Sequence, residues 1–452
     1  MNFEQNASTR NSIQNLFTAV ILSLLFVAPA AAQDSEKPED SQPGIHSGLL
    51  SSLKFRNLGP AFMSGRIGDV VVDPTNRSTW YVAACSGGVW KTTNAGVTWR
   101  PIFDNYGSYS IGCLAIDPND HFTIWVGTGE NNSQRSVGYG DGLYKSTDGG
   151  ASFKKVGLDN SEHIGKIVVH PDDSNTVFVA AQGPLWSEGG DRGLYKTTDG
   201  GSSWEKVLDI SANTGINEVH LDPTNPDIMY ASSYQRRRHT WVLIDGGPES
   251  GIHKSTDGGT TWKKINRGLP GGDKGRIGMA ISPINPEVVY AIVEATGSSS
   301  GFYRSSNRGE SWSRMSSEVS GSPQYYQEIV ACPHKFDRIY SLDTYLKVTE
   351  DGGKTFSRLG EANKHVDNHA MVIDPADPNH LIVGCDGGLY ETWDRGKTYD
   401  FKANLPITQF YKVAVSNEKP FTLFTVEHRI TRPKADLRKR PATTESSTAT
   451  GS

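Results

Sequence analysis

The residues best suited to chemistry gather late in the chain, in the segment His365-Val366-Asp367-Asn368-His369. Alternate residues of a β-strand face the same side, so His365, Asp367 and His369 project together if this segment is a strand. Asp386, in the turn after the next predicted strand, is placed to converge on them. Two imidazoles and a carboxylate can hold a divalent metal ion or act as acid and base. We therefore expect catalytic candidates at Asp367, His369 and Asp386, and candidate metal ligands at His365, Asp367 and His369. A hydrogen-bonded channel lining is the alternative.

A second set of polar residues lies in two predicted insertions between strands, where loops on a rigid scaffold commonly carry binding residues. The ligand-binding candidates in these insertions are Glu130, Asn132, Gln134, Arg135, Arg236, Arg237 and Arg238. Three adjacent arginines indicate an anionic ligand or an acidic peptide, and a solvated, ion-paired loop is an equal alternative. Arg66 and Asp69, near the start of the first predicted repeat, join the binding candidates.

These residues must be positioned by a repeat that dominates the sequence. Seven segments share the pattern S/T-x-D/N-x-G-x-S/T-aromatic, from Thr92–Trp99 to Thr392–Tyr399. Consecutive copies are 43 to 58 residues apart, the length of one four-stranded propeller blade. Their acidic or amide positions are Asn94, Asp148, Asp199, Asp257, Asn307, Asp351 and Asp394.

Strand signals flank each copy of this Asp-box. A β-branched run such as Ile164–Val169 precedes a second such as Thr176–Ala180, and Gly-Leu-Tyr-Lys then follows, as at 193–196. In the box, the Asp or Asn oxygen accepts bonds from backbone N–H groups of its own turn, and the glycine tolerates a positive φ. Because the turn uses this chemistry fully, we assign the box residues a structural role.

The repeats predict an all-β fold, a seven-bladed β-propeller of four-stranded antiparallel blades with Asp-box hairpins, plus a partial eighth repeat. The expected parts are a signal peptide at 1–32, a flexible lead-in at 33–50, the propeller at 51–403, the start of an incomplete further blade at 404–421 and a disordered low-complexity tail at 422–452. A truncated or frame-shifted product would explain the break near residue 422, and a natural tail is the alternative.

The first residues predict export. Arg10, the apolar run Leu16–Ala28 and the small residues Ala30–Ala32 are typical of a secretory signal peptide, so we expect a secreted or periplasmic protein. The apolar run is short for a membrane span, although a retained anchor is the competing interpretation. With no second candidate in the sequence, we expect no stable membrane span.

Net charge and cysteine spacing limit the partners and metal sites that we expect. A formal charge of −5 over 452 residues gives no electrostatic reason to expect nucleic acid. The four cysteines are far apart and lack C-x-x-C spacing, which predicts buried free thiols rather than zinc or a disulfide framework. The sequence leaves the oligomeric state open.

The Asp-box copies resemble the BNR/Asp-box propellers, which include sialidases, two-propeller xyloglucanases and the luminal domain of sortilin-type receptors. Secreted bacterial proteins described as sortilin-like or glycosyl-hydrolase-like are more similar still, in Gly127–Ser136, Gln182–Trp186, Tyr234–Arg238 and His365–Ala370. The resemblance covers about residues 50 to 418. It implies the fold strongly and the function weakly, because one fold hosts many activities.

The resemblance leaves two functions to weigh. Glycosidases need two carboxylic groups, and the xyloglucanases place one Asp in a first-blade segment that resembles residues 81–88 here, where Cys85 takes its position. Sialidases need an arginine triad; the sequence offers Arg66 as a first member, and the other two cannot be placed. We therefore expect a module that binds a peptide or glycan through its central funnel, without glycosidase turnover. The alternative is a glycoside hydrolase-like enzyme that uses channel carboxylates and the cluster His365, Asp367 and His369.

Overall fold

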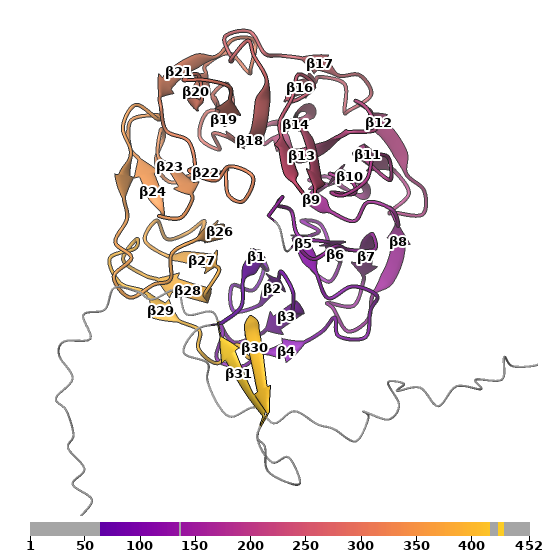
Figure 1. The fold of residues 1–452 in the computed structure, drawn as a ribbon, viewed down its shortest axis with the longest axis vertical. Helices are drawn as coiled ribbons and strands as arrows, with labels where there is room; N and C mark the ends of the chain where they lie inside the picture. Colours follow the sequence, from indigo (N-terminus) through magenta and orange to yellow (C-terminus); the bar gives the residue numbers. More distant parts are fainter. Residues whose placement is uncertain (1–63, 135–136, 416–423, 429–452) are drawn as a thin grey trace, which may run out of the picture. The chain divides into compact units, whose positions relative to one another are not determined.

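The computed structural model describes residues 64–134, 137–415 and 424–428. Strands β1 to β29 form seven antiparallel sheets, arranged as the blades of a ring (Figure 1). Blades 1 to 3 comprise β1 (Ile67–Val72), β2 (Trp80–Ala84), β3 (Gly88–Thr92) and β4 (Arg100–Pro101); β5 (Ile111–Ile116), β6 (Ile124–Thr128), β7 (Leu143–Ser146) and β8 (Lys154–Gly157); and β9 (Ile164–His170), β10 (Asp173–Ala181), β11 (Gly193–Thr197) and β12 (Glu205–Leu208). Blade 4 comprises β13 (Thr214–Asp222), β14 (Asn225–His239), β16 (Gly251–Ser255) and β17 (Lys263–Lys264), with β15 (Val242–Asp245) paired to β14.

The remaining blades repeat the same order of strands. Blades 5 to 7 comprise β18 (Lys274–Ile281), β19 (Val289–Ala295), β20 (Gly301–Ser305) and β21 (Ser313–Ser316); β22 (Glu328–Ala331), β23 (Ile339–Leu342), β24 (Lys347–Thr349) and β25 (Ser357–Arg358); and β26 (Asn368–Ile373), β27 (Leu381–Cys385), β28 (Gly388–Thr392) and β29 (Asp400–Phe401). The described residues contain no helix, and so none long and apolar enough to cross a membrane. The predicted seven-bladed β-propeller is confirmed.

Each Asp-box joins the third and fourth strands of a blade, and its chemistry is local. In blade 2 the Ser146 hydroxyl donates to Asp148 Oδ1 at 2.7 Å, and the N–H of Ser152 donates to the same oxygen at 2.9 Å. These bonds, with that from the Ser152 hydroxyl, lower the pKa of Asp148 to about 2. Gly150 takes a φ of +84°, which a residue with a Cβ adopts only with strain.

Lysines of the third strands tie neighbouring blades together. Lys91, Lys145 and Lys196 each donate to a glycine carbonyl in the Asp-box of the next blade, at 2.7, 3.0 and 2.8 Å. The aromatic residue of the box adds a second tie, because Trp204 Nε1 of blade 3 donates to Val156 O of blade 2 at 2.7 Å. The recurring Gly-Leu-Tyr-Lys segment therefore serves the contact between blades.

The ring closes by packing of side chains rather than by exchange of a strand. Ile67 and Val82 of blade 1 and Ile382 and Leu389 of blade 7 share one buried cluster. The Ser64 N–H also donates to Gly387 O at 2.9 Å, which fixes the approach to β1. All four cysteines are buried free thiols, as expected.

After blade 7, β30 (Phe410–Val415) pairs with β31 (Phe424–His428) in a two-stranded sheet. β30 is the strand expected to open an eighth repeat, but β31 arises in the segment predicted as a disordered tail. An eighth blade is therefore not confirmed. The predicted signal peptide and lead-in, and residues 429–452 of the tail, lie outside the described residues.

Candidate functional site

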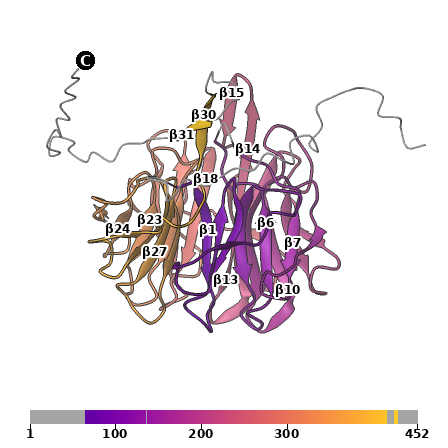
Figure 2. The same ribbon diagram turned by 90° about the horizontal axis from the view of Figure 1, so that it is seen from below.

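One face of the ring collects the residues that precede each first strand and follow each second strand. The antiparallel registers pair Ile67 with Ala84 and Asn368 with Cys385, so these ends lie together. We call this face the mouth face. The β14–β15 hairpin extends β14 beyond the ring on this side, as the view in Figure 2 shows.

Three of the predicted residues meet in a buried ion network on the mouth face. Arg66 donates from Nε to Asp386 Oδ1 at 2.8 Å and from Nη1 to Glu130 Oε2 at 2.7 Å. Asn132 Nδ2 donates to the same Glu130 oxygen at 3.1 Å. Burial alone would lower the pKa of Arg66, but the carboxylates of Asp386 and Glu130 raise it well above its usual value. Blades 1, 2 and 7 are therefore linked through one guanidinium group.

Both carboxylate oxygens of Asp386 accept hydrogen bonds from neighbouring side chains. The Tyr325 hydroxyl lies 2.7 and 2.8 Å from its two oxygens, and His369 Nε2 lies 2.8 Å from Oδ1. Burial alone would raise the pKa of Asp386, but the bond from His369 and the charge of Arg66 hold it well below its usual range. Asp386 is thus a fixed anion that orients its neighbours, 4% exposed.

The proposed cluster of His365, Asp367 and His369 does not form on one strand face. β26 begins only at Asn368, and Asp367 has a φ of +69°, so the alternation assumed from the sequence is broken before the strand starts. Asp367 Oδ1 instead accepts a bond from the Tyr326 hydroxyl at 2.5 Å, and His365 Nδ1 lies 2.5 Å from Val366 O. No three His, Cys, Asp or Glu side chains of the described residues are grouped so that they could hold a metal ion.

Two loops meet over the axis of the ring. The Ser133 N–H of blade 2 donates to Gln324 O, in the segment before β22, at 2.8 Å. Asn131 Nδ2 donates to Glu328 Oε1 at 3.2 Å, and Tyr325 bonds Asp386. We call these three contacts the cross-ring bridge. They lie at the mouth face, where the funnel was predicted to bind a ligand.

The arginine triplet supports this bridge. Arg236 is 1% exposed and donates from Nη1 to Asn132 O and to the Ser133 hydroxyl, both at 2.9 Å. Arg238 Nη2 donates to Ser133 O at 2.9 Å, and Arg237 Nη2 donates to Asn213 Oδ1 at 2.5 Å. Burial lowers the pKa of Arg236 to about 9. These arginines hold a loop in place instead of presenting a row of cations to an anionic ligand.

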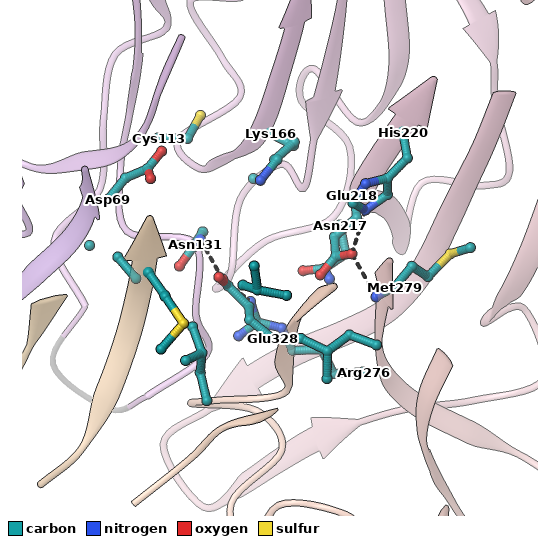
Figure 3. Close-up of a pocket in the computed structure, with 17 residues that line it drawn as sticks. Asp69, Cys113, Asn131, Lys166, Asn217, Glu218, His220, Arg276, Met279 and Glu328 are labelled. Carbon is teal, nitrogen blue, oxygen red and sulfur yellow. Dashed lines mark hydrogen bonds and ion pairs between the residues drawn. The ribbon is translucent and has the colours of Figure 1, made fainter. Parts of the chain in front are cut away.

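Of the remaining predicted residues, Gln134 lies beside the cross-ring bridge and Asp69 lies near the axis of the ring. Gln134 donates its N–H to Asn132 Oδ1 at 3.0 Å, and Arg135 lies outside the described residues. Asp69 points to the axis, where it accepts bonds from the N–H groups of Val70 and Leu114 at 2.8 and 2.9 Å. Burial raises its pKa. Figure 3 shows Asp69 at the edge of a small chamber.

The chamber is too small for a sugar. Its volume is about 80 Å³, well below the about 300 Å³ at which ligand pockets typically begin. A wider open groove of about 670 Å³ lies instead between the mouth-face loops of blades 2 and 3. The residues lining this groove are Tyr139, Gly140, Asp141, Asp159, Asn160, Glu162, Pro184, Ser187, Glu188, Gly190 and Asp191.

Glu162 is the unusual residue of this groove. It has a φ of +60°, uncommon for a residue other than glycine, and its carbonyl accepts the Gly140 N–H at 2.7 Å. Burial raises the pKa of its carboxyl, although Arg192 and Arg236 oppose the shift. Nothing in the sequence pattern distinguished Glu162 from a solvated loop residue, because its position depends on contacts between two blades.

Arg192 does not line the groove but holds the loop that forms one side of it. It is 1% exposed, and it donates to Gln182 O at 2.8 Å, Ser187 O at 2.7 Å and Gly189 O at 2.9 Å, and also to Pro184 O. Because these are neutral carbonyls, burial lowers the pKa of Arg192 to about 10.

Seven blades with seven Asp-boxes define the class of the molecule: it is a seven-bladed β-propeller of the BNR/Asp-box type. A family model described as sortilin, neurotensin receptor 3, matches residues 141–269. Xyloglucanase Xgh74A of Acetivibrio thermocellus is 26% identical over 294 residues, which cover 57% of this chain and 32% of that protein. A xyloglucanase of Hypocrea jecorina is 24% identical over 396 residues, which cover 76% of this chain and 42% of that protein.

Solved structures show the same fold. The GH74 xyloglucanase from Xanthomonas campestris superposes with a TM-score of 0.56 at 16% identity, over 76% of this chain and 55% of that one. An ancestral GH74 enzyme gives a TM-score of 0.57 at 19% identity, over 80% of this chain and 48% of that one. The chain thus spans less than half the length of the curated relatives it matches.

These relatives overturn one expectation. The loss of an Asp at the position of Cys85 led us to expect a protein without glycosidase turnover, but the proteins that this chain resembles in sequence are named as xyloglucanases. The chain is a glycoside hydrolase-like propeller. The reasoning failed because one position was taken to stand for a whole site.

Proposed function

We propose that this propeller binds a glycan chain in the groove between blades 2 and 3 and takes part in hydrolysis of its glycosidic bonds, with Glu162 as proton donor. The sequence similarity to xyloglucanases over more than half of the chain carries the proposal. A β-glucan such as xyloglucan is therefore the first substrate to test. Export would bring the protein to such polysaccharides, in keeping with the predicted signal peptide.

The groove supports this function by its size and position. Ligand sites of about 300–1,000 Å³ are typical, and the groove falls within this range, whereas the axial chamber does not. Tyr139, 70% exposed, offers a flat ring at the groove for stacking against a sugar. The cross-ring bridge leaves this part of the mouth face uncovered.

Its carboxyl groups support acid–base chemistry. A glycosidase needs one carboxyl that holds a proton and one that is ionised. Burial raises the pKa of Glu162, as a general acid requires. Asp191 Oδ2 accepts the Asn160 N–H at 2.9 Å and Asp141 Oδ2 accepts the Tyr144 hydroxyl at 2.6 Å, so both carboxyl groups are held at the groove, where either can serve as the base.

Release of reducing ends from xyloglucan and other β-glucans tests the proposal. We expect Glu162→Gln to lower the rate by about 10²–10⁴-fold, the usual contribution of a general acid. The rate should fall as the pH rises through the pKa of Glu162, because only the protonated carboxyl donates. Glu205→Gln, at an exposed Glu on β12 of the same blade, is the matched control. A protein that neither binds nor cleaves any glycan of the panel would refute the function.

A further inference from the structure

The β14–β15 hairpin, which rises beyond the ring on the mouth face in Figure 2, carries a pocket on one of its sides. The pocket has a volume of about 260 Å³, close to the about 300 Å³ at which ligand pockets typically begin. Because alternate residues of a strand share a face, Gln235, Arg237 and His239 of β14 face it together. The full lining is Asn213, Gln235, Arg236, Arg237, His239 and Ile244.

Arg237 differs from its two neighbours in the arginine triplet. Arg236 and Arg238 donate to Ser133 in the loop of blade 2, whereas Arg237 donates from Nη2 to Asn213 Oδ1, the oxygen of a neutral amide. The Nε of Arg237 is buried and has no hydrogen-bond partner among the described residues, and its guanidinium group forms no ion pair with any of them. A buried donor without a protein partner indicates a water molecule or a ligand that accepts its bond.

The charge of the lining favours an anion. No carboxyl group of the described residues lines this pocket, while two guanidinium groups do. The carboxyl groups of the adjoining segment already have other partners. Asp245 accepts the Tyr234 hydroxyl, and Glu249 Oε2 accepts the Ser211 hydroxyl at 2.6 Å. The unpartnered guanidinium nitrogen therefore faces a pocket in which no carboxylate competes for it.

The other groups at the pocket suit a ligand with hydroxyls and a flat apolar face. Gln235 uses its Oε1 to accept the Glu249 N–H at 3.3 Å, and its Nε2 has no partner in the part of the chain that the structure describes. The His239 ring stacks on Trp241, with centroids 5.6 Å apart and an angle of 11° between the planes. Trp241 is 83% exposed, so its ring is free to pack against a sugar. A bare inorganic anion would use Arg237 and leave these groups without a role.

We propose that this pocket binds a sugar acid, such as one hexuronate unit of a glycan. Its carboxylate would accept bonds from Arg237, its hydroxyls would bond Asn213 and Gln235, and one face of its ring would pack on Trp241. The volume admits one sugar unit and not a longer chain. The pocket is independent of the proposed hydrolysis, because its lining shares no residue with the groove between blades 2 and 3.

Titration calorimetry of the full chain with glucuronate tests the site. Glucuronate should bind at least about 10-fold more tightly than glucose, acetate or inorganic phosphate, since each of these lacks either the carboxylate or the sugar ring. Arg237→Met should weaken glucuronate binding by at least about 10-fold, because hydrogen bonds to charged groups are among the stronger ones. Arg267→Met, at an exposed arginine after β17 of the same blade, is the matched control and should keep the wild-type affinity.

A second variant separates a sugar acid from an anion alone. Trp241→Ala changes an exposed turn residue, so the Tm should stay the same, while glucuronate binding should weaken by about 3-fold or more and acetate binding should not change. If Arg237→Met does not fold, this variant and the ligand series on the wild type decide.

Five results would overturn the site. These are no binding of glucuronate, equal affinity for glucose and glucuronate, acetate or phosphate bound as tightly as glucuronate, glucuronate binding that survives Arg237→Met, and glucuronate binding unchanged in Trp241→Ala.

Discussion

Ser133 and Gln324 lie on blades 2 and 6, on different sides of the ring, and are joined by a hydrogen bond of 2.8 Å from N–H to carbonyl. This bond joins two loops of the mouth face across the ring. The ion network of Arg66, Glu130 and Asp386 lies at the same level and links three blades. Our proposal therefore places glycan binding in the open groove between blades 2 and 3.

Removal of Arg66 should destabilise the ring. Arg66→Met leaves Glu130 and Asp386 buried without their cation, and loss of one partner of a buried ion pair costs about 3–5 kcal/mol. Urea unfolding should show a loss of that size in the free energy of unfolding. Arg100→Met, at an exposed arginine of β4, is the control. A loss below about 1 kcal/mol for Arg66→Met would mean that the network contributes nothing net.

His380 should make the stability of blade 7 depend on pH. Its Nδ1 lies 3.0 Å from Asp374 and its Nε2 lies 2.8 Å from Glu391, and Trp393 stacks on the ring at 3.6 Å. Burial alone would lower the pKa of His380, but the two carboxylates raise it. A group whose folded pKa is raised stabilises fully below its unfolded pKa, about 6.5, and this contribution is lost as the pH rises through the folded pKa.

The measurement compares wild type with His380→Gln across pH. At about pH 6 the variant should be less stable by about 1.5–3 kcal/mol, the worth of hydrogen bonds to a charged group, and the difference should shrink as the pH rises above the folded pKa. His121→Gln, outside any such pair, should show no such trend. A difference that grows with pH would reverse the sign and contradict the assignment.

The fold was predictable because its signals are local and repeated. Each Asp-box closes its own turn, so the residue types of Ser146, Asp148 and Gly150 fix a hairpin without help from elsewhere. Seven such hairpins at blade spacing leave few alternatives to a ring. The eighth repeat was the exception, since one strand pattern without its box cannot specify a blade.

The site was only partly predictable, because it depends on contacts between distant segments. Arg66, Glu130 and Asp386 were candidates and do meet, since each follows or precedes a strand at the mouth face. The positive φ of Asp367 broke the pattern that grouped it with two histidines. The sequence did not mark Glu162 as a site residue, because the groove that it lines is formed by loops of two blades.

Arg192 should control the shape of the groove. A lysine places its donors on one nitrogen atom and cannot reach the carbonyls of Gln182, Ser187 and Gly189 together, as the guanidinium group does. Arg192→Lys should speed amide exchange in residues 183–190 and weaken oligosaccharide binding by at least about 10-fold. Arg314→Lys, at an exposed arginine of β21, is the control and should leave amide exchange in residues 183–190 and oligosaccharide binding unchanged. Unchanged exchange in 183–190 would show that the loop holds its shape without Arg192.

The Asp-box should tolerate an amide but not the loss of its acceptor. Oδ1 of Asn94 and of Asn307 accepts the same backbone bond in blades 1 and 5 as Oδ1 of Asp148 does in blade 2, with Asn94 Oδ1 accepting the Thr98 N–H at 2.9 Å. Asp148→Asn should therefore change the free energy of unfolding little. Asp148→Ala leaves the N–H of Ser152 and the hydroxyl of Ser146 without their acceptor, and about 1 kcal/mol should be lost in urea unfolding. Equal losses in the two variants would show that the charge of Asp148, and not its place as an acceptor, stabilises the turn.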